Sequence, residues 1–394
     1  MGGFSKQTVR DLDVQGQRVL LRVDFNVKIE NGRILEDARV RAALPTISYL
    51  LDQGAALIII SHLGRPKGVY EEKYSLKPVA ELLGQLLGQP VLFAKDCLGA
   101  AVEKQAAALE EGQALMLENL RFHLEEEQND PVFAGKLAKL ADIFVNDAFG
   151  MAHRAHASTE GVAEYLPAYA GLLMEEELRS LGKALYEPER PLVAVIGGAK
   201  VADKIVMIEN LLDKVDKLLI GGGMANTFLA AQGCNMQGSP VEEDRLPMVK
   251  ELLNRPAAAK LVLPTDVVAA QAFEPGAAQQ NVEPQALPEG WLALDIGPAT
   301  RQIFAAELAR ARTIVWNGPV GVFEMEPFAA GTVAVAQAVA ESGAFSVVGG
   351  GDSIAAVKQA GIAERISFIS TGGGAMLKFM EGKKLPGVAV LEDR

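Results

Sequence analysis

The chain has 394 residues, of which 49% are hydrophobic and 22% charged, with 39 glycines and a formal net charge of −12 at pH 7. This length predicts two domains, and the composition is that of a folded, turn-rich protein rather than a disordered one. The acidic net charge argues against nucleic-acid and anionic-membrane binding, and the sequence shows neither a signal peptide nor an apolar run of transmembrane length, which favours a cytoplasmic protein.

Short apolar runs alternate with longer helical patterns along almost the whole chain. Several of the apolar runs are continuous, which is typical of strands that are buried on both faces of a parallel sheet. The pattern predicts an α/β fold with parallel sheets. The expected strands are 18–23, 56–61, 90–93, 114–117, 142–145, 192–196, 217–220, 260–263, 313–316, 345–348 and 366–369, and the expected helices include 76–87, 101–110, 132–141, 203–213 and 332–341.

Residues 172–186 have the pattern of a single amphipathic helix, followed by Pro188 and Pro191. About five expected strands precede this helix and about six follow it, which fits two sheets better than one. We therefore predict an N-terminal domain, an interdomain hinge helix and a C-terminal domain, with the tail fitting either domain on pattern alone. The corresponding ranges are 1–171, 172–186, 187–381 and, for the tail, 382–394.

In the first half, four of the five expected strands are each followed by polar residues. The carboxyl ends of parallel strands face the crevice of an open sheet, and the planar donor fork of arginine suits phosphate. Singly, these residues also fit turn chemistry or solvated surface, and His62 fits a loop histidine about equally well. Together they predict a pocket for a small, multiply charged anion; the histidines and cysteines match neither zinc spacing nor a Ser-His-Asp order. The residues are Asp24, Asn26, His62, Arg65, Glu118, Asn119, Arg121, Asn146, Asp147, His153, Arg154 and His156.

In the second half, glycine runs follow the strands at 197–198, 221–223, 349–351 and 372–374. A strand that ends in glycines before a helix presents backbone N–H groups to a phosphate, and Asp352 lies where a phosphate-bound Mg²⁺ can use it. Lys200 and Lys204 are expected to share one helix face. Glycines also permit close packing, and neither G-x-x-x-x-G-K-[ST] nor G-x-G-x-x-G is present. The combination predicts a site for a nucleoside triphosphate with Mg²⁺.

These motifs, in this order, resemble those of the phosphoglycerate kinase family from about Thr8 to Glu392. The resemblance implies an α/β protein with two Rossmann-like domains, each a mainly parallel sheet flanked by helices, joined by a hinge helix. It also implies a monomeric glycolytic enzyme that transfers a phosphoryl group between 1,3-bisphosphoglycerate and ADP, giving 3-phosphoglycerate and ATP, with Mg²⁺. The motifs are RVDFNV at 22–27, HLGRPKG at 62–68, ENLRF at 118–122, NDAF at 146–149, AHRAHAS at 152–158, GGAKV at 197–201, WNGP at 316–319, GGGDS at 349–353 and STGGGA at 370–375.

The resemblance further implies roles for individual residues. Those expected at 3-phosphoglycerate are Asp24, Phe25, Asn26, Arg39, His62, Leu63, Gly64, Arg65, Arg121 and Arg154. Those expected at the nucleotide are Lys204, Gly297, Asn317, Glu324, Gly350, Gly351, Asp352 and Ser353, with Asp352 also on Mg²⁺. Those expected at the phosphoryl group in transfer are Arg39, Lys200, Gly372, Gly373 and Gly374. By the same resemblance, the tail 382–394 returns to the first domain.

Two positions depart from the family pattern, since Lys28 and Leu124 stand where prolines are expected. They affect loop stiffness and remove no contacting group. A carboxylate acceptor has a pKa of about 3.5 and is already ionised, so the reaction needs alignment, charge neutralisation and closure over the reactants rather than a base.

Two rival functions are another small-molecule kinase and a non-enzymatic phosphate-binding protein of the same fold. The other kinase would use a different carboxylate or phosphate acceptor, which a turnover assay distinguishes. The presence of Lys200, Lys204 and Asp352 argues against the non-enzymatic protein.

Overall fold

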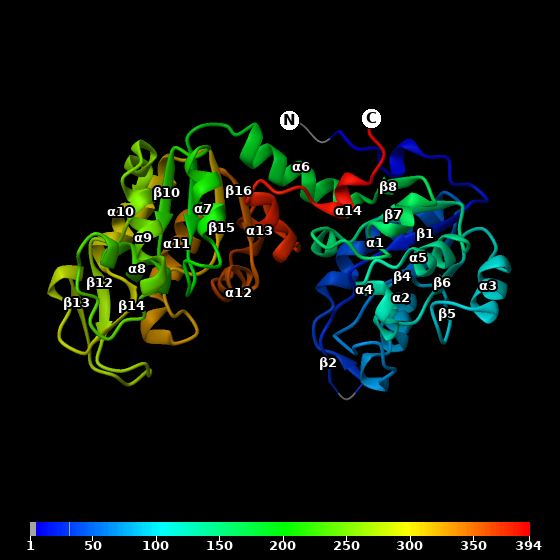
Figure 1. The fold of residues 1–394 in the computed structure, drawn as a ribbon, viewed down its shortest axis with the longest axis horizontal. Helices are drawn as coiled ribbons and strands as arrows, with labels where there is room; N and C mark the ends of the chain where they lie inside the picture. Colours follow the sequence, from blue (N-terminus) through cyan, green and yellow to red (C-terminus); the bar gives the residue numbers. More distant parts are fainter. Residues whose placement is uncertain (1–4, 31) are drawn as a thin grey trace. The chain divides into compact units, whose positions relative to one another are not determined.

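A computed structural model describes residues 5–30 and 32–394, which form two compact units (Figure 1). The first unit comprises residues 5–179 and Lys384–Arg394, and the second comprises Ser180–Lys383. The change from one unit to the other falls inside helix α6 (Leu172–Tyr186). Among the described helices, none is both long and apolar enough to cross a membrane.

The first unit is built on a six-stranded parallel sheet with the strand order β5-β6-β4-β1-β7-β8. Strand β4 is buried at all five positions, and helices α1 and α2 pack their apolar residues into the same core as β1 and β4. Its strands are β1 (Arg18–Arg22), β4 (Ala56–Ile60), β5 (Val91–Phe93), β6 (Ala114–Met116), β7 (Ile143–Asn146) and β8 (Ala168–Ala170), with a separate hairpin of β2 (Ile29–Glu30) and β3 (Arg33–Ile34). Its helices are α1 (Ala38–Asp52), α2 (Lys77–Leu87), α3 (Ala100–Ala107), α4 (Leu124–Glu127), α5 (Pro131–Ala138) and α14 (Pro386–Ala389).

The C-terminal segment packs against the first unit, beside β7 and β8 (Figure 1). The backbone N–H of Glu392 donates to the carbonyl of Ala168 (2.8 Å), and the N–H of Gln7 donates to the carbonyl of Glu392 (2.8 Å). The N–H of Gly387 donates to the carbonyl of Ala152 (2.9 Å). Residues from both ends of the chain therefore extend the edge of the first sheet.

The second unit has a six-stranded parallel sheet with the order β11-β10-β9-β15-β16-β17 and a three-stranded antiparallel sheet with the order β13-β12-β14. The parallel strands are β9 (Leu192–Ile196), β10 (Lys217–Ile220), β11 (Leu261–Val262), β15 (Thr313–Asn317), β16 (Phe345–Gly349) and β17 (Phe368–Ser370), and the antiparallel strands are β12 (Val267–Ala270), β13 (Gln279–Val282) and β14 (Leu292–Ile296). The helices are α7 (Ile205–Leu212), α8 (Gly223–Ala231), α9 (Leu246–Leu253), α10 (Pro298–Arg310), α11 (Ala330–Glu341), α12 (Gly351–Gln359) and α13 (Gly374–Met380).

The predicted α/β class with two mainly parallel sheets is confirmed, and every strand and helix predicted from the sequence is present with ends shifted by a few residues. Helix α1 is not among the helices named from the sequence; Pro45 lies inside it, although proline normally ends a helix. The antiparallel sheet was also not predicted, because β13 is polar and exposed and gives no apolar pattern.

Candidate active site

The carboxyl ends of four strands meet at one edge of the first sheet. Arg22, the last residue of β1, pairs with Ile60 of β4 and Asn146 of β7, and β6 pairs with β4 as far as Met116. The loops that follow therefore start next to one another, as the sequence predicted. They carry Asp24, Phe25, Asn26, His62, Leu63, Gly64, Arg65, Arg121 and Arg154.

Buried polar side chains fix these loops to one another. The hydroxyl of Ser61 accepts a hydrogen bond from the N–H of Phe25 (2.9 Å). The side-chain oxygen of Asn119 accepts from the N–H of Leu63 (3.2 Å), and its Nδ2 donates to the carbonyl of Leu63 (2.7 Å). The backbone at Phe25 and Leu63 is thus held by side chains from neighbouring strand ends.

Gly64 lies where only glycine fits. Its φ is +61°, and a Cβ there would lie 2.4 Å from the ring of Tyr74. Its N–H donates to Oδ1 of Asn26 (2.9 Å), and its carbonyl accepts from Nη1 of Arg121 (2.8 Å). Gly64 therefore joins the loop after β1 to the arginine that follows β6.

Four arginines surround this loop cluster. Nη1 of Arg39, from the first turn of α1, donates to Oδ2 of Asp24 (2.9 Å). Arg121 is buried, and its pKa is lowered by burial and by the positive charges of Arg154 and Arg65. Cations that are close enough to oppose one another are stabilised by a bound anion. The arrangement therefore favours a multiply charged anion.

His62 lies inside the same cluster and is only 1% exposed. Its pKa is lowered well below 6.5, first by burial and then by the positive charges of Arg22, Arg121 and Arg39. His62 is therefore neutral at physiological pH. It contributes hydrogen bonds to the site rather than positive charge.

His156 is a second buried histidine of this region; its sequence position also predicted it near the anion pocket, but the family resemblance assigns it no substrate contact. Its pKa is lowered to about 3, mainly by burial, with further lowering from neighbouring cations. The groups that act on it are Arg121, Arg22, Arg154 and His153, and Oε1 of Glu126 lies 3.8 Å from its Nδ1.

We expect this histidine to make the fold less stable in acid. Because the folded-state pKa lies below the unfolded value of about 6.5, the contribution of His156 to stability is complete above pH 6.5 and is lost as the pH falls toward 3. At pH 5 the loss is about 1–2 kcal/mol. Urea unfolding from pH 7.5 to pH 5 should show a smaller decline for His156→Gln than for the wild type. Equal declines would contradict the assignment.

A third group of side chains fastens the loop that carries Arg121. Oδ1 of Asp96 lies 2.8 Å from Nε2 of His123 and accepts from the N–H of Cys97 (2.7 Å). The ligand-type atoms of these three residues lie within 4.8 Å of one another, a grouping that spacing in the sequence did not predict. The Asp96 oxygen is already hydrogen-bonded to His123 and to the N–H of Cys97. These contacts therefore connect the segment after β5 to the segment after β6.

Leu124 and Lys28, which replace expected prolines, have different surroundings. Leu124 is the first residue of α4, a position that proline also tolerates. Its side chain packs over Gly68, where an added Cβ would lie 2.4 Å from Leu124 Cγ. Lys28 is exposed and pairs with Glu30 (2.7 Å). Leu124 therefore packs against the 62–68 loop, whereas Lys28 makes a surface ion pair.

In the second unit, Lys204 and Asn317 join the ends of three parallel strands. Nζ of Lys204 donates to the carbonyl of Gly197 (2.6 Å) and to Oδ1 of Asn317 (2.7 Å). Nδ2 of Asn317 donates to the carbonyl of Gly349 (2.9 Å), and the hydroxyl of Ser353 accepts from the N–H of Gly318 (2.5 Å). The predicted nucleotide residues Lys204, Asn317 and Ser353 therefore belong to one network.

The charge of Lys204 is influenced by two nearby carboxylates. Burial lowers its pKa to about 8, and the negative charges of Asp352 and Asp203 oppose that shift. A phosphate bound nearby would raise this pKa and keep the ammonium charged. Lys204 and Asp352 therefore lie close enough to act on the same ligand.

Three glycine runs form strand-to-helix turns, as predicted. Gly222, Gly350 and Gly373 are the N-cap residues of α8, α12 and α13, with φ values of 70°, 94° and 45°. The N–H of Met224 in α8 donates to the carbonyl of Gly198 (3.0 Å) and that of Ala375 in α13 to the carbonyl of Gly372 (2.8 Å), whereas the turn into α12 begins with exposed Gly351 and Asp352, where backbone N–H groups suit an anion. Asp352 is the second residue of α12 and is exposed beside Gly350 and Gly351, and Gly372 to Gly374 form the turn into α13.

The expectation for Lys200 and Lys204 was wrong. Helix α7 begins at Ile205 with Lys204 as its N-cap, so the two lysines precede the helix and do not share a helix face. Lys200 is exposed, whereas Lys204 is largely buried. The spacing misled because the glycines at 197–198 lead into turns rather than directly into a helix.

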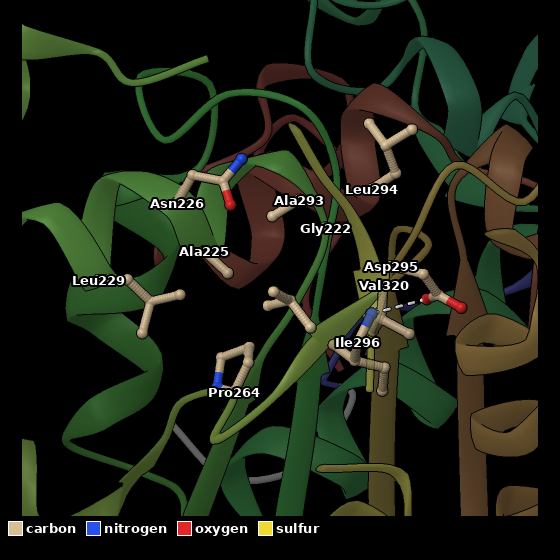
Figure 2. Close-up of a pocket in the computed structure, with 11 residues that line it drawn as sticks. Gly222, Ala225, Asn226, Leu229, Pro264, Ala293, Leu294, Asp295, Ile296 and Val320 are labelled. Carbon is tan, nitrogen blue, oxygen red and sulfur yellow. Dashed lines mark hydrogen bonds between the residues drawn. The ribbon is translucent and has the colours of Figure 1, made fainter. Parts of the chain in front are cut away.

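A small cavity lies behind the turn at Gly222 (Figure 2). It is lined by α8, β14 and the loop after β15, including Asn226, Ala293 and Val320. Its volume is about 10 Å³, roughly that needed for one water molecule. This cavity, as it stands in the structure, is therefore too small to enclose a nucleotide base.

Gly297 and Glu324 lie at the border of the antiparallel sheet. Gly297 follows β14 as the N-cap of α10, and a Cβ there would lie 2.2 Å from the carboxyl carbon of Asp266. Glu324 is exposed in the loop after β15, which is tied to β14 by the N–H of Val322 donating to the carbonyl of Leu294 (2.9 Å). The two residues thus flank the same sheet.

A family profile, a related protein sequence and two solved structures all relate this chain to the same family. The phosphoglycerate kinase family profile matches residues 9–383. The chain is 60% identical over 393 residues to phosphoglycerate kinase from Moorella thermoacetica, covering 99% of this chain and 100% of that protein. It is also similar to the solved structures of phosphoglycerate kinase from Coxiella burnetii (TM-score 0.91, 45% identity) and Pyrococcus horikoshii (TM-score 0.85, 37% identity), each covering 98% of both chains.

Proposed function

This chain belongs to the phosphoglycerate kinase family. From that premise we propose which of its residues bind the acceptor, which bind the nucleotide and which stabilise the phosphoryl group in transfer. It is a phosphotransferase with a carboxyl group as acceptor. In glycolysis it transfers a phosphoryl group reversibly from 1,3-bisphosphoglycerate to ADP, giving 3-phospho-D-glycerate and ATP. The residue roles that follow are proposals for this chain.

The cationic loops of the first unit bind 3-phosphoglycerate. The observation that supports this best is the buried Arg121, whose pKa is lowered by burial and by the positive charges of Arg154 and Arg65. Arginine forks suit the phosphate and carboxylate of this ligand, and neutral His62 and Asn26 suit its hydroxyl group. We assign the site to Asp24, Phe25, Asn26, Arg39, His62, Leu63, Gly64, Arg65, Arg121 and Arg154.

The glycine turns and Lys204 of the second unit bind ADP or ATP. The backbone N–H groups of the turns and the ammonium group of Lys204 suit the phosphates. Glu324 suits the ribose, and Gly297 suits the base. The carboxylate of Asp352 in the first turn of α12 is a hard oxygen ligand and fits Mg²⁺, which prefers one or two carboxylates together with nucleotide phosphates. Bound there, Mg²⁺ would neutralise phosphate charge. The set is Lys204, Gly297, Asn317, Glu324, Gly350, Gly351, Asp352 and Ser353.

Transfer itself requires alignment and charge stabilisation rather than proton removal. The acceptor carboxylate is ionised at neutral pH because its pKa is about 3.5. Arg39, Lys200 and the backbone N–H groups of Gly372 to Gly374 stabilise the charge on the transferring phosphoryl group. In-line transfer then passes the phosphoryl group directly between the two substrates.

The acceptor and nucleotide residues lie in different compact units, so we propose that hinge bending at α6 closes the enzyme for reaction. Small-angle scattering should show a smaller radius of gyration with 3-phosphoglycerate and a non-hydrolysable ATP analogue together than with either alone. An unchanged radius would contradict closure.

The same scattering measurement gives the molecular mass, which we expect to be that of a monomer of 41.9 kDa. We also propose a cytoplasmic location and no nucleic-acid or membrane partner.

The acceptor assignment is tested by a coupled assay of ADP formation from ATP. Turnover should require 3-phosphoglycerate, with acetate or carbamate giving at most background rates. Comparable turnover with acetate would favour a different acceptor. Calorimetry with 3-phosphoglycerate should in addition give binding to the wild type that weakens in Arg121→Ala.

A further inference from the structure

Four buried side chains form a continuous row behind the 3-phosphoglycerate site. The hydroxyl of Ser158 donates to Oε1 of Glu126 (2.6 Å) and accepts from Nε of Arg22 (2.8 Å). Nη2 of Arg22 lies 3.2 Å from Nδ1 of His62. Each of the four residues is at most 1% exposed. The row therefore connects the protein interior to His62, a proposed substrate-binding residue, without contact with bulk water.

The chemistry of arginine determines the direction of the last hydrogen bond. A guanidinium has five N–H donors and no acceptor, so Nδ1 of His62 must accept and cannot carry a proton. The alternative partner of Nδ1, Oδ1 of Asp24, lies at 3.9 Å, too far for a hydrogen bond. The single proton of the neutral ring must then be on Nε2.

We propose that Arg22, Ser158 and Glu126 act as positioning residues that hold His62 in its Nε2–H tautomer, ready to donate a hydrogen bond to an oxygen of 3-phosphoglycerate. This inference rests on the proposal that His62 contacts that substrate. Without this row, a neutral imidazole populates both tautomers, and only one of them can donate from Nε2.

Each member of the row has a defined part. Glu126 is fully buried, and its negative charge raises the pKa of Arg22 against the effect of burial. Ser158 holds the guanidinium plane, because it accepts from Nε while a second nitrogen donates to the carbonyl of Val23. Glu126 also accepts from the N–H of Ser158 (3.0 Å), which fixes the position of the hydroxyl. Arg22 is therefore held at both edges of its planar group.

The first test is the imidazole nitrogen NMR spectrum of the substrate-free enzyme at pH 7.5. The His62 signals should show a protonated Nε2 and an unprotonated Nδ1 in the wild type. Ser158→Ala should give averaged signals of both tautomers, and Ser158→Thr should restore the wild-type pattern because it keeps the hydroxyl. A wild-type His62 protonated on Nδ1, or a Ser158→Ala spectrum identical to wild type, would overturn the inference.

The second test separates positioning from general stability. Ser158→Ala should raise KM for 3-phosphoglycerate about tenfold while kcat changes by less than about twofold. Ser75→Ala is the matched control, because the Ser75 hydroxyl is also buried and donates to a buried carboxylate, Oε2 of Glu118 (2.6 Å). This control should lose comparable stability in urea with an unchanged His62 spectrum and KM. Loss of the His62 pattern in Ser75→Ala would overturn the inference.

The two tests also distinguish this inference from the proposal on which it rests. If the wild-type spectrum shows the Nε2–H tautomer but His62→Ala leaves the Kd for 3-phosphoglycerate unchanged in calorimetry, the contact between His62 and the substrate is wrong. If His62→Ala weakens binding but the tautomer does not depend on Ser158, the positioning role is wrong.

Discussion

Replacing Arg39 by alanine is expected to lower kcat by at least about a hundredfold while the fold stays intact. Loss of a contact to charge that develops in the transition state costs about 3 kcal/mol or more. Arg39 lies in the first turn of α1, and its side chain is 39% exposed, so its removal leaves no cavity in the core. Coupled-assay turnover and a urea unfolding curve measure the two effects separately.

The matched control for this prediction is Arg41→Ala. Arg41 lies on the same helix two residues further on, its side chain is 59% exposed, and it pairs with Asp37 (2.8 Å). An exposed pair of this kind contributes at most about 1 kcal/mol, so both stability and turnover should remain close to wild type. Near-normal kcat in Arg39→Ala, or an equal loss in Arg41→Ala, would remove Arg39 from the mechanism.

Asp352→Ala is expected to weaken binding of the Mg²⁺–nucleotide complex at least about tenfold, with unchanged affinity for 3-phosphoglycerate. The carboxylate is exposed in the first turn of α12, so its loss costs the helix only about 0.3–1 kcal/mol. Calorimetry with each ligand alone measures the two affinities. A wild-type affinity for Mg²⁺–ATP would contradict the assignment of Asp352 to the metal.

A second effect of Asp352 must be separated from metal binding. Its negative charge raises the pKa of Lys204, as does that of Asp203. Asp203→Asn is therefore the matched control, since it also removes a nearby negative charge but lies outside the glycine turn. It should leave Mg²⁺–nucleotide binding within about threefold of wild type, because a surface charge contributes little in water. An equal loss in both variants would assign the effect to the protonation of Lys204.

The sequence identified the strands that end in functional residues. The loops after β1, β4, β6 and β7 were expected at one edge because parallel strands share their direction, and the register at Arg22 confirms it. The glycines at 222, 350 and 373 were expected at helix starts, since a strand followed by glycines and a helical pattern defines such a turn locally.

The tertiary structure decided which groups act on one another. Lys204 reaches Asn317, 113 residues away, instead of sharing a helix face with Lys200. Arg22 meets Ser158 across 136 residues, and the pKa of His62 is lowered first by burial and then by the charge of Arg22 and other distant arginines rather than by any local spacing.

The difference between what the sequence predicted and what the tertiary structure decided has a physical cause. Strand periodicity, glycine turns and helix starts depend on residues that are neighbours in the chain, so their signals are present in the sequence. Burial and long-range contacts depend on the packing of distant segments; burial and the charge of Asp352 act in this way on the pKa of Lys204, and the hydrogen bond from Arg22 sets the tautomer of His62. The sequence by itself therefore determined the fold class and supplied the residues proposed for the candidate site, and only the tertiary structure decided their charge states and partners.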